Sequence, residues 1–100
     1  LALRHVAEME ARVGAIVAER RRLLGRLDGL GMTTWPSQAN FILFRPPGGR
    51  GREVWQGLVE RSVLVRDTSS WPGLEGCLRV TIGTPEENDR FLAALGGVMA

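Results

Sequence analysis

The sequence predicts an α+β fold, a small sheet of three or four strands, antiparallel or mixed, with helices on one face. A long stretch with helical periodicity opens the chain, short runs of branched and aromatic residues lie between turn signals, and a strong helix start precedes the C-terminus. The resulting order is helix, two strands, helix, two strands, helix. One hundred residues suit a single domain over 1–100, with a helix over residues 1–31 and an α+β layer over residues 32–100.

The segment Leu1–Leu30 predicts one long helix. It has no N-cap and is already in helical phase at Leu1, so we expect a helix that is cut within its length. Gly29 and Gly31 are expected to end it in the left-handed conformation. The apolar seam recurs at spacings of three and four, with Arg20 at its one missing place: Val6, Met9, Val13, Ile16, Leu23, Leu27 and Leu30.

The middle of the chain predicts a short helix over residues 52–61, after a Pro- and Gly-rich loop, PPGGRG. Branched and aromatic residues bounded by turn signals are typical of strands. The strands expected on this basis are residues 32–35, 40–45 (NFILFR), 63–66 (VLVR) and 78–82. The residues expected on the inner face of the short helix are Val54, Trp55, Leu58 and Val59.

The last helix has the clearest signal. Thr84 is the expected N-cap, Pro85 takes the first helical position, and Glu87 completes a capping box three residues after the cap. The residues expected on its inner face are Phe91, Leu92 and Leu95.

Composition limits the possible functions. The chain has 44% hydrophobic and 24% charged residues, no apolar run of membrane-spanning length and no opening signal peptide. One cysteine cannot form an internal disulfide, so we expect a protein of the reducing cytoplasm. The single Cys77 is expected to be a buried apolar residue. A net charge of +2 is weak support for nucleic-acid binding, and the run ERRRLLGR (19–26) is more simply a solvated helix face. No metal-ligand spacing or catalytic set occurs. All thirteen basic residues are arginine, so the chain cannot anchor a pyridoxal cofactor through lysine.

Arg79 lies within an otherwise apolar strand, LRVTI, which is an unusual place for a permanent charge. Side chains alternate along a strand, so if Leu78 and Val80 pack beneath the helices, Arg79 points out of the opposite face. A planar guanidinium binds a carboxylate or phosphate through two parallel hydrogen bonds. The position therefore indicates an anion-binding side chain.

Arg66 is the second candidate, at the end of the neighbouring predicted strand. It shares the face of Leu64, so a local bend or the strand end decides where it points. The sequence leaves open ordinary ion pairs: Arg79 with Glu86 or Asp89, and Arg66 with the adjacent Asp67.

Three motifs resemble a known family: SQANFILFR (37–45), VLVRD (63–67) and PGLEGCLRVTIGTPEENDRFLAAL (72–95). In this order and spacing the chain resembles the C-terminal small domain of histidinol-phosphate aminotransferases, which are pyridoxal-phosphate enzymes of fold type I. CLRVTIGTPEEN is the most specific part of the match. The helix from Leu1 resembles the one that leaves the large cofactor-binding domain of such enzymes.

The resemblance implies roles for three residues. Arg79 would bind the substrate α-carboxylate, and Arg66 would approach the side-chain end where histidinol phosphate carries its phosphate. Asn40, the third substrate-binding candidate, would lie at the domain junction. Since histidinol phosphate has a hydroxymethyl group in place of a carboxylate, Arg79 would engage the carboxylate of glutamate or 2-oxoglutarate. Two positions depart from the family: Ser62 replaces a common glycine and strains a left-handed turn, and Trp71 alters the wall beside Arg66.

The resemblance also implies a larger enzyme. The whole protein would bind pyridoxal phosphate in a large domain of the same chain, form a homodimer and catalyse reversible transamination in histidine biosynthesis. This chain would supply substrate recognition and be inactive alone, with no catalytic, cofactor-binding or metal-binding residue of its own.

Two alternatives stay open from the sequence. A phosphothreonine decarboxylase or an aromatic aminotransferase is a relative with the same kind of small domain. A stand-alone α+β module would instead bind an acidic metabolite through Arg79 and Arg66.

The absence of lysine gives a direct prediction. After incubation of the isolated chain with pyridoxal phosphate and gel filtration, the protein peak should carry no cofactor absorbance, because no side chain can form the covalent link. A retained absorbance band would contradict this prediction.

Overall fold

A computed structural model describes residues 2–35 and 40–100, with side chains described from residue 13 onward apart from the same gap. The described residues form three helices and four strands, with a short 3-10 helix in the loop after the second strand. In order, they are α1 (Ala2–Gly29), β1 (Thr33–Trp35), β2 (Phe41–Arg45), η1 (Pro47–Gly49), α2 (Gly51–Glu60), β3 (Arg66–Asp67), β4 (Leu78–Thr81) and α3 (Pro85–Met99).

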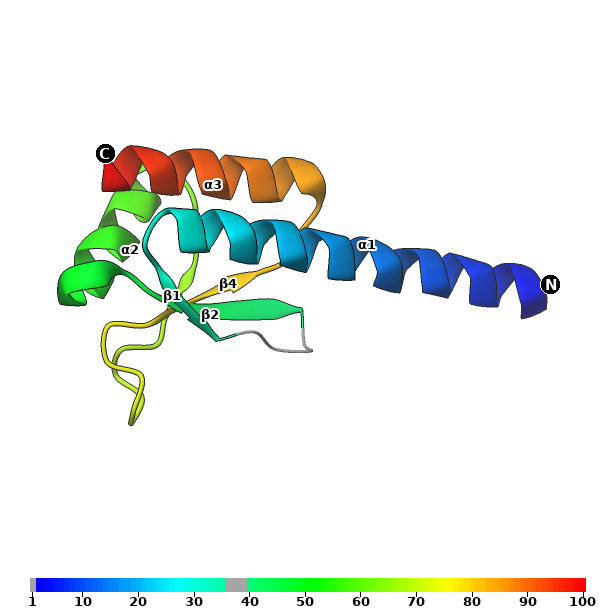
Figure 1. Cartoon of the computed structure of the whole chain (residues 1–100), viewed down its shortest axis with the longest axis horizontal. Coiled ribbons are helices and arrows are strands. Elements are labelled where there is room, and N and C mark those ends of the chain that lie inside the picture. The colour runs from blue at the N-terminus through cyan, green and yellow to red at the C-terminus, as the bar shows by residue number, and fades with distance from the viewer. Residues whose placement is uncertain (1, 36–39) are drawn as a thin grey trace.

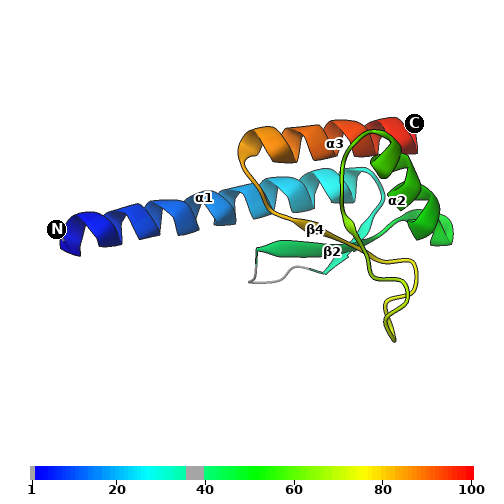
Figure 2. The same cartoon turned by 180° about the vertical axis from the view of Figure 1, so that it is seen from behind.

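The four strands form one antiparallel sheet in the order β1-β2-β4-β3, with β4 between β2 and β3. All three helices lie over the same face of this sheet, which leaves the other face open (Figures 1 and 2). The predicted α+β class, the antiparallel strand pairing and the helices on one face are therefore confirmed.

The core lies between the sheet and the helices. Phe44 of β2 and Phe91 of α3 meet edge to face with ring centroids 5.8 Å apart, in the offset geometry that aromatic pairs favour. Cys77 is fully buried, as expected for an apolar role. The buried residues around this pair include Leu23, Leu27, Ile42, Leu58, Leu78, Val80, Leu92 and Leu95.

Helix α1 extends well beyond the sheet and the other helices (Figures 1 and 2). Its apolar seam consequently divides into two parts. Leu23 and Leu27 are fully buried against the layer, whereas Val13, on the same seam, is 60% exposed. The predicted periodicity is correct, but only the second half of the described seam is covered.

The strand predicted at residues 63–66 is wrong, since only Arg66 and Asp67 pair with β4. The backbone just before them is directed to α2: the Val63 N–H donates to the Leu58 carbonyl at 2.9 Å, and the Trp55 indole N–H donates to the Val65 carbonyl at 3.0 Å. These bonds hold the segment away from the sheet edge. Leu64 is accordingly 83% exposed.

Two smaller expectations also fail. Val59, expected to face inward, is 38% exposed, because the buried stripe of α2 is narrow and centres on Val54 and Leu58. Gly29 is the last helical residue of α1 rather than a left-handed one. Gly31 does take the left-handed conformation, with φ of 82°.

Helix α2 ends with a residue that has to be left-handed although it is not glycine. Ser62 has φ of 61°, and it donates its N–H to Val59 while Val63 donates to Leu58. These paired bonds form a Schellman motif, in which glycine is the usual left-handed residue. The strain expected at Ser62 from the sequence is thus located at a defined backbone position.

Replacement of this residue gives a stability prediction. Ser62→Gly should raise the free energy of unfolding by about 1 kcal/mol, because it removes the steric cost of a left-handed L-residue while keeping both backbone bonds. Equilibrium urea denaturation would measure the change. Ser62→Ala, which keeps the Cβ atom, is the control and should not be stabilising; equal stabilisation by both variants would contradict the explanation.

Candidate functional site

The open face of the sheet is the surface opposite the helices, and one row of it carries Trp35, Leu43, Arg79 and Arg66. The row is set by register, because Trp35 lies opposite Leu43, Leu43 opposite Arg79, and Arg79 opposite Arg66. Directly paired residues of antiparallel strands project from the same side. The structure therefore brings the two arginines predicted from the sequence side by side.

Strand β4 determines this arrangement through its alternation. Leu78 is fully buried and Val80 is 6% exposed beneath the helices, so Arg79 between them is turned to the open face and is half-buried. Arg66, in the short strand β3, is exposed. The question of where Arg66 points is thus settled by its pairing with Arg79.

Two like charges directly opposite each other are unfavourable, so the chain would be expected to supply a neutralising acid. Within residues 13–35 and 40–100, neither Arg79 nor Arg66 has an acidic partner. Asp89, one of the expected alternatives, lies 2.7 Å from Arg22 instead. Asp67 accepts hydrogen bonds from the backbone N–H and hydroxyl of Ser69.

Aromatic rings take the place of acids on this face. The Arg79 guanidinium carbon lies 5.1 Å from the ring centroid of Phe41, and that of Arg66 lies 5.5 Å from Trp71. A third pair, which the sequence did not suggest, places Arg45 5.2 Å from Trp35. A cation over a ring keeps its full charge, and the in-plane N–H groups of a guanidinium stay available to an anion.

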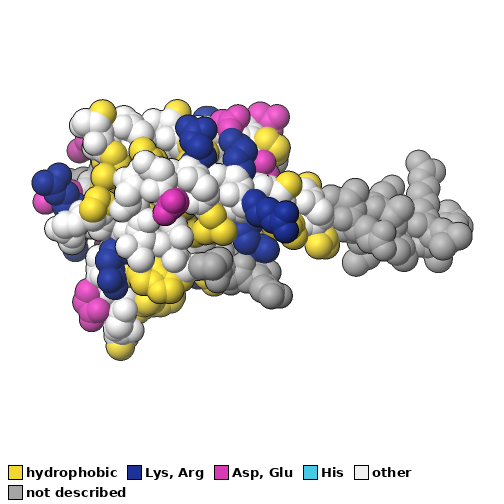
Figure 3. Space-filling view, in the orientation of Figure 1, with side chains coloured by type: hydrophobic (Ala, Val, Ile, Leu, Met, Phe, Trp, Pro, Cys, Tyr) yellow, Lys and Arg dark blue, Asp and Glu magenta, His cyan; other side chains and the backbone are white. Residues whose placement is uncertain are grey.

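The two guanidiniums lie on an open surface. Cavities beside the end of β4 and beside the start of α2 have volumes of about 360 and 550 Å³, and both are lined by other residues. Hydrophobic side chains are exposed in the space-filling view along the side that bears the strands (Figure 3). This combination of exposed apolar and cationic groups is typical of a surface that a partner completes.

Asn40 is not part of the arginine row. It is an exposed residue just before β2, and its carbonyl accepts the Ile82 N–H at 2.8 Å. It lines a cavity of about 300 Å³ with residues of α1, namely Val13, Ile16, Val17 and Arg20. The structure therefore places Asn40 beside α1 rather than beside the two arginines.

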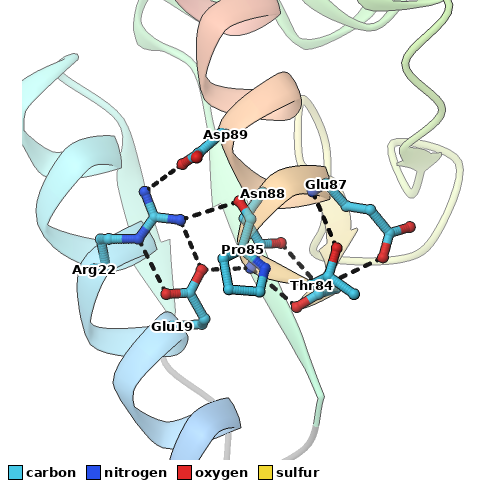
Figure 4. Close-up of polar contacts among 8 residues, drawn as sticks. Glu19, Arg22, Thr84, Pro85, Glu87, Asn88 and Asp89 are labelled. Atoms are coloured by element: carbon cyan, nitrogen blue, oxygen red, sulfur yellow. Dashed lines mark hydrogen bonds and ion pairs between the residues drawn. The ribbon is translucent and has the colours of Figure 1, made fainter.

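A second polar cluster, not expected from the sequence, joins α1 to the start of α3 (Figure 4). The Asn88 side chain is buried, accepts the Gly83 N–H at 2.9 Å, and donates to the Gly83 carbonyl at 3.1 Å and to Glu19 Oε1 at 2.9 Å. Its spacing from Phe91 and Leu92, three and four residues on, places it on the inner stripe of α3. That spacing was the available signal for a buried polar residue.

The rest of the cluster is an ion-pair network. Arg22 donates to both carboxylate oxygens of Glu19, at 2.6 and 3.1 Å, and to Asp89 at 2.7 Å. The hydrogen bonds that Glu19 accepts, chiefly from Arg22 and then from Asn88, lower the pKa of its carboxyl below the ordinary value. Arg22 belongs to the basic run 19–26, so that run carries less free positive charge than its sequence suggests.

The first turn of α3 is capped as predicted. Thr84 Oγ1 accepts the Glu87 N–H at 3.2 Å, and the Glu87 carboxylate accepts the Thr84 N–H at 3.0 Å (Figure 4). The pKa of the Glu87 carboxyl is lowered, first by the hydrogen bond from the Thr84 backbone N–H and then by the Thr84 hydroxyl. The three hydrogen bonds of the Asn88 side chain, two to Gly83 and one to Glu19, form a clamp. This Asn88 clamp and the capping box together fix the backbone that follows β4.

No cluster of three or more His, Cys, Asp or Glu side chains suited to a metal ion occurs among the residues that the structure describes. Over the same residues, no helix combines the length and the apolar character needed to cross a bilayer.

Comparison with known proteins identifies the class of protein. The family model for aminotransferase class I and II matches residues 2–95, and the chain belongs to this family. The chain is 46% identical to the histidinol-phosphate aminotransferase of Aquifex aeolicus over 85 residues, which covers 84% of this chain and 24% of that protein. It is also 46% identical to the Corynebacterium efficiens histidinol-phosphate aminotransferase over 94 residues, with coverage of 94% and 24%. The chain thus spans about a quarter of the length of these curated relatives.

Solved structures share the fold. The histidinol-phosphate aminotransferase from Clostridium acetobutylicum aligns with a TM-score of 0.85 and 27% identity, over 94% of this chain and 29% of that one. L-threonine-O-3-phosphate decarboxylase from Porphyromonas gingivalis aligns with a TM-score of 0.64 and 30% identity, over 77% and 26%. The fold alone is shared with the Sinorhizobium meliloti histidinol-phosphate aminotransferase, solved with pyridoxal-5'-phosphate, at 24% identity, a TM-score of 0.76, and coverage of 85% and 24%.

The ion-pair network gives a prediction for acid stability. Because the folded-state pKa of Glu19 is lowered, its carboxylate stabilises the fold above its ordinary pKa of 4.5, and this stabilisation is lost as the pH falls through the folded-state pKa. Glu19→Gln should therefore lower stability at pH 7 and flatten the decline of stability between about pH 5 and pH 3. Urea denaturation at several pH values would measure this.

Glu60→Gln, at an exposed position of α2, is the matched control and should keep the wild-type slope. A Glu19→Gln variant with the full wild-type dependence on pH would show that the network does not control acid stability.

Proposed function

We propose that this chain is the substrate-recognition region of a pyridoxal-phosphate-dependent aminotransferase that transfers an amino group between histidinol phosphate and 2-oxoglutarate or glutamate, in histidine biosynthesis. The observation that carries the proposal is the pairing of Arg79 with Arg66 across two strands, with aromatic rings but no acid beside them in the described part of the chain. Two adjacent unneutralised guanidiniums suit small anionic substrates, because each guanidinium can hold a carboxylate or a phosphate. The likeness to histidinol-phosphate aminotransferases supports this choice of substrate.

The two arginines would divide the substrate between them. Arg79, held over Phe41 at the centre of the sheet, would bind the carboxylate of glutamate or 2-oxoglutarate. Arg66, at the edge strand, would bind the group at the other end, which is the phosphate in histidinol phosphate. Both contacts use N–H donors of a group that stays charged at every relevant pH, so they orient the substrate without taking up or releasing a proton.

This chain has no residue that could anchor the cofactor. Pyridoxal phosphate in such enzymes requires a lysine, and all thirteen basic residues here are arginine. We therefore assign the cofactor and its lysine to the remaining part of a longer protein, and assign to this chain only binding and orientation of the substrate. The isolated chain would have no transaminase activity.

The junction with that remaining part would lie along α1. Val13, Ile16 and Val17 present apolar groups around the cavity that Asn40 also lines, and Val13 is 60% exposed. A large domain packed here would cover this seam and bring its cofactor toward the open face of the sheet. The whole enzyme would be a cytoplasmic homodimer.

A second function is favoured by one observation. Paired arginines would equally suit a phosphorylated amino acid, and the chain also resembles a solved L-threonine-O-3-phosphate decarboxylase. The full-length protein, given histidinol phosphate and 2-oxoglutarate, should form glutamate. Release of carbon dioxide from L-threonine O-3-phosphate, with no glutamate formed, would replace the first function by the second.

A substitution tests the role of Arg79. In the full-length protein, Arg79→Ala should raise the KM for glutamate and lower kcat/KM by about tenfold to a thousandfold, the effect of losing a charged contact of roughly 1.5–4 kcal/mol. Steady-state kinetics would measure it. Arg50→Ala, which removes an exposed loop arginine, is the control and should leave the kinetics unchanged. Unchanged kinetics in Arg79→Ala would refute the assignment.

A further inference from the structure

The loop between β3 and β4 has a defined shape, and Trp71 lies near its middle. Successive turn bonds of 3.0 Å run from the Trp71 N–H to Thr68, from Leu74 to Trp71 and from Cys77 to Leu74. Thr68 is fully buried and closes the base of the loop, since its backbone N–H and hydroxyl both donate to the Cys77 carbonyl, at 3.2 and 2.8 Å. The loop extends on the side of the sheet away from the helices (Figure 1). It therefore holds Trp71 at the border of the open face.

The acid beside Arg66 is occupied within the same loop. Asp67 accepts hydrogen bonds from the Ser69 backbone N–H, at 3.0 Å, and from its hydroxyl. These bonds, the one from the hydroxyl first, lower the pKa of the Asp67 carboxyl, so it is ionised and held by the loop. Arg66 consequently has Trp71, not Asp67, as its described neighbour, at 5.5 Å from the ring centroid.

Arg66 needs such a neighbour more than Arg79 does. It lies on a strand of only two residues at the edge of the sheet, it is exposed, and Arg79 opposite repels it. An exposed arginine side chain in this position has many rotamers. The conformational entropy lost when a ligand holds it in one of them reduces the affinity. A ring against the guanidinium fixes its plane and leaves its edge free for an anion.

We propose that Trp71 is a positioning residue for the anion that Arg66 binds, and that it sets the preference of the enzyme for a phosphorylated over an unphosphorylated substrate. The ring is 42% exposed, so it also forms a wall at this end of the open face. The inference deepens the proposed function and rests on it. It gives a role to the residue by which this loop departs from the resembled family.

The test uses the full-length protein and one ratio, kcat/KM for histidinol phosphate over kcat/KM for histidinol. The ratio is internal to each preparation, so a partly unfolded variant lowers both terms alike. Arg66→Ala should lower it by about tenfold or more, and Trp71→Ala by about three- to tenfold. Trp71→Leu, which keeps apolar bulk without a ring, should behave like Trp71→Ala, while Trp71→Phe should stay within about twofold of wild type.

The double variant separates the possible failures. If Trp71 acts through Arg66, Trp71→Ala should cause no further loss in an Arg66→Ala background. An unchanged ratio in Arg66→Ala would overturn the proposed role of Arg66 and this inference with it. A loss in Arg66→Ala with none in Trp71→Ala, or fully additive losses in the double variant, would overturn the inference about Trp71 alone.

Discussion

Strand β4 has to meet two opposite demands, and its alternation satisfies both. Leu78 and Val80 contribute to the core beneath the helices, while Arg79 between them is projected from the other face of the same strand. Neither face can change independently, because a shift of one residue in register would bury the charge and expose the apolar pair. The antiparallel pairing with β2 and β3 fixes that register, and the position of every group on the open face follows from it.

The fold could be predicted largely from local patterns. Periodicity gave the helices, Thr84 and Glu87 gave the start of α3, and alternation gave the outward direction of Arg79. The largest failure, the strand predicted before Arg66, has a physical cause in backbone groups that bind outside the sheet. The predicted strand before Arg66 is drawn toward α2 by bonds from Val63 and from the Trp55 indole, and no residue pattern within four residues reveals such distant partners.

The candidate site shows the same division. The sequence identified both arginines by residue type, but the pairing of Arg66 with Arg79 depends on register, which is a property of two strands together. The stacking of Arg66 on Trp71 depends further on a loop whose shape is set by buried Thr68 and by Asp67. Asn40 was identified by resemblance alone, as a residue of the domain junction, and it lies beside α1, apart from the arginine row. Residues whose position comes from tertiary bonds were the ones that sequence reasoning placed least well.

The clamp made by Asn88 has a mechanical consequence. It ties the backbone at Gly83, directly after β4, to Glu19 of α1, so the end of the strand that carries Arg79 is bonded through one side chain to the second half of the long helix. A displacement of that part of α1 would therefore be passed to β4 through Asn88.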